Sequence, residues 1–133
     1  MRVREAVGIP GIGLVVVLGA LSACGPKGQV TIRGPEATDD APQEWVEAFT
    51  EAMDNNQPRF VTCYEDVLKE DAAVQGTVTV QIELGAPSFP SARANTTGSD
   101  VLADCVIESS PSKIYLHSAP DGNLTFELDF APK

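Results

Sequence analysis

Hydrophobic residues recur at helical spacing between residues 43 and 74. The first set has the spacing i, i+1, i+4 and i+8, and it comprises Trp45, Val46, Phe49 and Met53. The second set repeats the pattern after an Asn-Asn-Gln-Pro break, and it comprises Phe60, Val61, Tyr64, Val67 and Leu68. Both patterns are typical of amphipathic helices. Pro58 suits the first turn of the second helix, where no backbone N–H is needed. The segment therefore predicts two helices or one kinked helix.

Beyond Gly76 the apolar residues alternate with polar ones, which predicts half-buried strands. The alternation covers Val78 to Leu84 and, near the end of the chain, Leu124 to Phe130. Residues 91–97 predict a weaker strand, and residues 114–116 predict a short one that would join the last strand through a hairpin turn at residues 121–122. Ser99 predicts the N-cap of a short helix that carries Val101, Leu102, Cys105 and Val106 on one face.

The order of these elements is helix, strand, weak strand, helix, strand and strand. It predicts an α+β fold in which two N-terminal helices, or one kinked helix, and a third short helix pack on a small antiparallel sheet of three to four strands. The chain has 133 residues, enough for one domain.

The first residues have the character of an export signal. Arg2 and Arg4 precede an apolar stretch from Ile9 to Ala20, which is shorter than the roughly 20 residues that a membrane-spanning helix needs. The stretch ends in Leu-Ser-Ala followed by Cys24, which resembles the lipobox of bacterial lipoproteins. The pattern predicts cleavage after residue 23 and lipid attachment to Cys24. An ordinary secretory signal followed by a chance cysteine is the alternative.

Three regions follow from this prediction: a signal peptide at 1–23, a lipidated cysteine with a flexible tether at 24–42, and the folded domain at 43–133. The tether is rich in Gly, Pro and acidic residues, although Val30–Ile32 could form an added edge strand. Acyl chains contribute about 0.8 kcal/mol per buried methylene, so lipid would hold the protein to a membrane without a spanning helix. Because Gly25, rather than aspartate, follows Cys24, the outer membrane facing the periplasm is favoured over the inner membrane.

The charge of the chain excludes one class of partner. With 9 basic and 19 acidic side chains its formal net charge is −10, and loss of the first 23 residues, which carry two arginines and one glutamate, makes it about −11. Such a surface repels phosphate backbones, so nucleic-acid binding is not expected.

The cysteines add a covalent constraint. If lipid occupies Cys24, only Cys63 and Cys105 remain, and a disulfide is the default state in an oxidising envelope. The bond would close a loop of about 43 residues, for which the loss of loop-closure entropy corresponds to roughly 4 kcal/mol. It would connect the second and third helices.

Two sequence blocks resemble a known family. The first runs Cys-Tyr-Glu from Cys63, with Gly-Thr-Val-Thr-Val beginning at Gly76, and the second is Leu-Ala-Asp-Cys-Val at residues 102–106. Together they resemble the AgmX/PglI C-terminal domain, a TonB-C-like family of myxobacteria and related bacteria, over about residues 60–130. The resemblance implies a Cys63–Cys105 disulfide, a TonB-C-like fold in the periplasm, Gly76 at the opening of the first strand, and envelope protein interactions without catalytic residues. The family commonly has an Asp-Gly turn after the first strand and an Arg- and aromatic-rich end of the last helix. This chain has other residues at both places.

No residue pattern predicts catalysis. His117 is the one histidine, and no nucleophile or carboxylate is singled out as its partner. No spare Cys or His could complete a metal site, and no cofactor motif is present. We therefore expect a non-enzymatic protein-interaction module that is anchored to the membrane and binds an envelope protein. A small-ligand-binding lipoprotein and a thiol-disulfide redox protein that uses Cys63 and Cys105 are the alternatives.

Overall fold

The computed structural model describes residues 25–114, 116 and 120–133. The predicted signal peptide, Cys24 and His117 lie outside the described residues. Within the described part of the chain, no helix is both long enough and apolar enough to cross a membrane.

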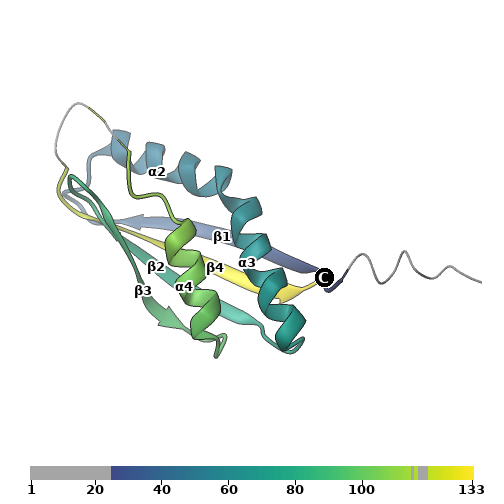
Figure 1. The fold of residues 1–133 in the computed structure, drawn as a ribbon. Helices are drawn as coiled ribbons and strands as arrows, with labels where there is room; N and C mark the ends of the chain where they lie inside the picture. Colours follow the sequence, from purple (N-terminus) through teal and green to yellow (C-terminus); the bar gives the residue numbers. More distant parts are fainter. Residues whose placement is uncertain (1–24, 115, 117–119) are drawn as a thin grey trace, which may run out of the picture.

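The described residues form an antiparallel sheet with three helices on one of its faces (Figure 1). The strands lie in the order β1-β4-β2-β3, and every neighbouring pair is antiparallel. Their bounds are Gly28–Ala37 for β1, Gly76–Glu83 for β2, Phe89–Asn95 for β3 and Asn123–Pro132 for β4. The predicted α+β class is confirmed, with four strands among the described residues.

Alternation of side chains places one face of the central strands β2 and β4 in the core. Each inward residue is fully or almost fully buried, and these residues are Val78, Val80, Ile82, Leu124, Phe126, Leu128 and Phe130. The intervening residues are mostly threonine, glutamine and acidic side chains that face away from the helices. The sheet therefore has one apolar face and one polar face.

The helices supply the other half of the core. They are α2 (Gln43–Asn55), α3 (Gln57–Glu70) and α4 (Asp100–Ser109), and their apolar stripes include Trp45, Phe49, Met53, Phe60, Tyr64 and Leu102, all of which are buried. Asn56 separates α2 from α3, and Pro58 lies in the first turn of α3, as predicted. The Ser99 hydroxyl accepts a hydrogen bond from the Leu102 N–H at 3.0 Å, which confirms the predicted N-cap of α4.

The prediction of a tether over residues 24–42 is wrong for most of its length. Residues 28–37 form edge strand β1, which confirms the alternative of an added edge strand at Val30–Ile32, and Val30 is buried against the helices. The Gly-Pro pair at residues 34–35 suggested a break, but it lies in an irregularity between Arg33 and Glu36 after which pairing with β4 resumes. Val30 and Ile32 alternate with polar residues, and this short pattern was the one signal for the strand.

Two smaller expectations also need correction. The weak strand is observed at residues 89–95 instead of 91–97. Ile114 and Leu116 are not in a strand but pack, half-buried, against the edge of the core. Side-chain packing on the core accounts for the apolar character of these two positions, and among the described residues between α4 and Asp121 there is no strand for the predicted hairpin.

The start of β1 fits tightly against α3. A Cβ atom at Gly28 would clash with the ring of Tyr64, so no larger residue fits there without movement of this buried ring. Tyr64 donates a hydrogen bond from its hydroxyl to the Val74 carbonyl and packs edge-on against Phe130.

The last residue of the chain lies close to the start of β1, because the Lys133 N–H donates to the Lys27 carbonyl at 3.0 Å. The C-terminus thus lies beside the start of β1 (Figure 1).

Candidate functional site

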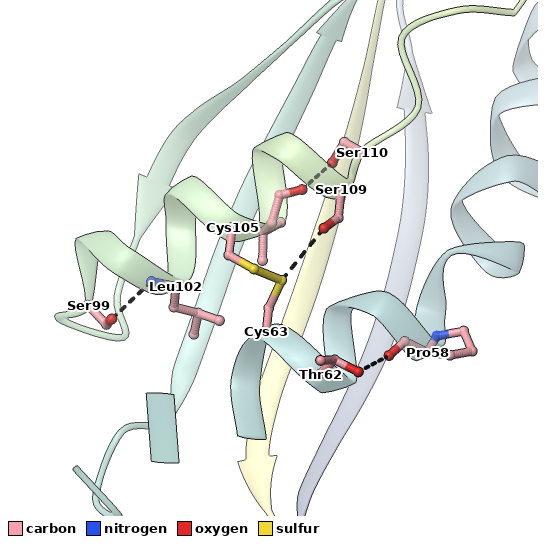
Figure 2. Close-up of a disulfide and its surroundings, with 9 residues drawn as sticks. Pro58, Thr62, Cys63, Ser99, Leu102, Cys105, Ser109 and Ser110 are labelled. Atoms are coloured by element: carbon pink, nitrogen blue, oxygen red, sulfur yellow. Dashed lines mark hydrogen bonds between the residues drawn. A yellow bond between two sulfur atoms is a disulfide. The ribbon is translucent and has the colours of Figure 1, made fainter. Parts of the chain in front are cut away.

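Cys63 and Cys105 are joined, as predicted from the cysteine count. Their sulfur atoms are 2.01 Å apart and their Cα atoms 5.8 Å apart, across a separation of 42 residues. The bond connects α3 with α4 on the helical side of the sheet (Figure 2). The Ser109 hydroxyl lies 3.6 Å from the Cys63 sulfur. The described residues therefore contain no free thiol, and the pair acts here as a cross-link between two helices.

Within residues 25–114, 116 and 120–133, no three His, Cys, Asp or Glu side chains converge on one point. Candidate binding surfaces of the described residues are the two edges of the sheet and the groove between α3 and α4.

One edge of the sheet is closed by side chains from α3. The Gly28 N–H donates to Glu65 Oε2 at 3.1 Å, and the Val30 carbonyl accepts from Gln57 Nε2 at 3.1 Å. Both backbone groups belong to β1 and point away from β4. An edge strand normally presents such groups as a template for another chain. Because Glu65 and Gln57 already satisfy them, the first half of β1 is poorly suited to pair with a further strand.

The opposite edge of the sheet, formed by β3, lacks this cover. Within the described residues, no side chain is hydrogen-bonded to the backbone of residues 89–94. Most of the strand is exposed, and Phe89 keeps 61% of its surface accessible. Only two large hydrophobic residues in the described part of the chain are this exposed, and Phe89 is one of them. The open edge therefore combines unpaired backbone with an accessible aromatic ring.

The position of Pro90 indicates which backbone groups of β3 point outward. Proline is tolerated in an edge strand where its nitrogen faces away from the neighbouring strand. Pro90 lies opposite Ile82, and Ala92 lies opposite Val80 two residues later. Because backbone direction alternates along a strand, the N–H and carbonyl groups of Ala92 also point outward. Ala92 is thus the residue at which a further strand could gain backbone hydrogen bonds.

The polar face of the sheet carries an ionic network across three strands. Arg33 on β1 lies 2.7 Å from Glu127 and forms a two-point contact with Asp129, with distances of 2.7 and 3.1 Å. The Thr77 hydroxyl on β2 donates to Asp129 at 2.7 Å. The hydrogen bonds from Arg33 and then from Thr77 lower the pKa of Asp129 below its ordinary value of 3.8. The network fastens β1 to the centre of the sheet.

We predict that Asp129→Asn will weaken the fold in a pH-dependent way. The carboxylate has a lowered pKa in the folded state, so its contribution is complete above pH 3.8 and disappears as the pH falls through the lower folded value. Since Asp129 is partly exposed, solvent screening limits the loss at neutral pH to less than about 1 kcal/mol. Urea unfolding between pH 7 and pH 2 should show the variant approaching the wild type in acid. An Asp121→Asn control that behaved identically would contradict a specific role for the network.

Sequence reasoning identified the two bonded cysteines but not the closed edge of β1. Gln57 and Glu65 are ordinary helix residues in the sequence, and their roles depend on the placement of β1 beside α3. The only local signal was the Val30 and Ile32 alternation. The predicted lipidation site, Cys24, and the lone histidine, His117, lie outside the described residues.

The arrangement defines a class of protein: a disulfide-closed α+β domain whose helices cover one face of an antiparallel sheet and leave one sheet edge open. Beyond this class, the chain matches no family model, no curated protein sequence and no solved structure. The AgmX/PglI resemblance and its TonB-C-like fold therefore stay predictions.

Proposed function

We propose that this protein is a membrane-anchored envelope lipoprotein that binds another envelope protein, without catalysis, by pairing an extended segment of that partner with β3. Lipid on Cys24 would hold it to the outer membrane, where it faces the periplasm. The observation that carries the proposal is the difference between the two sheet edges. Glu65 and Gln57 close β1, whereas the backbone of β3 has no comparable side-chain cover in the described part of the chain.

Strand addition is a common way for a domain to bind an extended peptide. Backbone hydrogen bonds provide affinity, and side chains at alternate positions provide specificity. At β3 the outward groups of Ala92 would supply the hydrogen bonds. Phe89 would supply an apolar contact on the polar face of the sheet, where it lies opposite Glu83. Pro90 has no backbone N–H, so it limits the number of hydrogen-bond donors that β3 directs away from β2. This favours a short paired segment and restrains edge-to-edge aggregation.

The proposal can be tested with an Ala92→Pro variant. Proline removes the outward N–H but no hydrogen bond to β2, so the fold should survive while pairing with a partner is lost. A copy tagged at the C-terminus through a flexible linker would be crosslinked in intact cells, purified and identified by mass spectrometry with its partners. We expect the wild type to enrich an envelope protein. The recovery of that protein should fall about tenfold with Ala92→Pro, which corresponds to the loss of about 1.4 kcal/mol of binding free energy.

Ala92→Val is the matched control, because it alters the side chain but keeps the N–H. It should recover the same partner as the wild type. Equal recovery with Ala92→Pro would show that the β3 edge is not used. Failure of the correctly anchored wild type to enrich any envelope protein would contradict an interaction module altogether.

A further inference from the structure

A groove between α3 and α4 combines an apolar floor with an acidic rim. Its volume is about 500 Å³, which is within the range of about 300–1,000 Å³ typical of ligand sites. The floor consists of the Cys63–Cys105 disulfide with Val67 and Val74, which are each only 8% exposed. Val101 lines the same groove and is 71% exposed. Together with Phe89 it is one of the two highly exposed large hydrophobic residues in the described part of the chain.

Four carboxylates surround this apolar floor. Asp66 and Glu70 are one turn apart on α3, Asp71 follows the helix, and Asp100 begins α4. No lysine, arginine or histidine of the described residues lines the groove. The nearest basic group in sequence, Lys69, lies 3.4 Å from Asp66, and both side chains are well exposed. The rim therefore carries a net negative charge next to an accessible valine.

The carboxylates are not arranged to bind a metal ion. Within the part of the chain that the structure describes, no three acidic, histidine or cysteine side chains could share one ion. A set of carboxylates spread around an apolar floor instead suits several separate positive charges. Each cation could contact one carboxylate while an apolar group between the cations covers Val101.

We propose that this groove binds a basic peptide segment of a partner protein, in which two or more lysine or arginine side chains flank a leucine-sized apolar side chain. Charge complementarity selects this occupant over the others. A second copy of the chain has a formal charge of −10 and would be repelled by the rim. Phosphate-bearing lipid and nucleic acid would be repelled for the same reason. A free polyamine could satisfy the carboxylates but would leave Val101 uncovered.

The groove and the β3 edge are separate surfaces, so the two proposals can fail independently. The groove involves residues of α3 and the start of α4, whereas strand pairing depends on the backbone at Ala92. A peptide that binds in the groove should therefore bind equally well to the Ala92→Pro variant. This comparison separates the two sites within one set of purified proteins.

The test uses the full chain in detergent and a fluorescein-labelled decapeptide of lysine, leucine and serine, with affinity measured by fluorescence anisotropy. The groove variant combines Asp66→Asn, Glu70→Gln and Asp100→Asn. We expect it to weaken binding about tenfold, since each exposed ion pair contributes only a modest amount. The control variant combines Glu47→Gln, Glu51→Gln and Asp54→Asn, which removes the same charge from the exposed surface of α2. It should change the affinity less than about twofold, as distant charges are largely screened at physiological salt.

Two further measurements probe the apolar contribution. Val101→Ser should weaken binding several-fold, and a decapeptide with serine in place of leucine should bind weakly to the wild type, because each change removes apolar surface from the contact. Amide resonances of residues 98–101 should shift when the leucine peptide is added. Equal losses of affinity in the groove and control variants would reduce the effect to general charge attraction and overturn the proposal. Equal binding of the leucine-free peptide would overturn it as well.

Discussion

Replacement of both Cys63 and Cys105 by serine is expected to lower the free energy of unfolding by about 4 kcal/mol. The bond closes a loop with a sequence separation of 42 residues, and loss of loop-closure entropy in the unfolded chain accounts for this size. It is a large fraction of the roughly 5–15 kcal/mol that stabilises a typical domain. Urea unfolding followed by circular dichroism, on the full chain in detergent, would measure the change.

Reduction provides the control for this prediction. Dithiothreitol should destabilise the wild type by a similar amount and leave the double serine variant unchanged, since that variant has no bond to lose. Cys63 is almost fully buried, so part of any loss could reflect the altered packing of serine, and the effect of dithiothreitol on the wild type separates the two causes. A loss below about 1 kcal/mol in both experiments would contradict a major stabilising role for the bond.

Cys24→Ser is expected to move nearly all of the protein from the membrane fraction to the soluble fraction. A hydroxyl cannot replace the thiol that takes the lipid, so the variant would lose the acyl chains that attach it to the membrane. One acyl chain gives only marginal membrane binding, whereas two or more give stable attachment. Immunoblotting of separated membrane and soluble fractions would measure the distribution.

The double serine variant at Cys63 and Cys105 is a matched control for the anchor. It changes two cysteines but keeps Cys24, so it should stay in the membrane fraction. Metabolic labelling with a palmitate analogue should mark the wild type and the control but not Cys24→Ser. Persistent membrane association of unlabelled Cys24→Ser from which residues 1–23 have been removed would rule out lipid as the anchor.

The central part of the fold could be predicted because its sequence patterns are long. Apolar residues alternate through β2 and β4, and both helical stripes cover at least two turns. The edge strand β1 has only Val30 and Ile32 as a signal, and a Gly-Pro pair follows directly. Its burial comes from contact with α2 and α3, which no local pattern reveals. At Ile114 and Leu116 the sequence predicted a strand where these residues form none, since their apolar side chains pack on the core without strand pairing.

The candidate site was predictable only in its covalent part. With Cys24 assigned to lipid, a single cysteine pairing was left, so Cys63 and Cys105 could be identified by counting. The closure of β1 depends on Gln57 and Glu65, which meet the strand only in the folded chain. The apolar floor and acidic rim of the groove likewise come from two helices that are distant in sequence. Such surfaces follow from tertiary packing and have no sequence motif.

The position of β1 directly after Cys24 in the sequence determines how the domain would transmit force. If Cys24 is the anchor, tension enters the domain at the first residue of β1, only a few residues away, and acts along that strand. A partner held at β3 would pull on the far side of the sheet. The hydrogen bonds between strands lie perpendicular to the strands, so the part of the load that runs along β1 would be shared among them as shear and would not open them one after another. The domain would then act as a mechanical link that resists extension between the membrane and its partner.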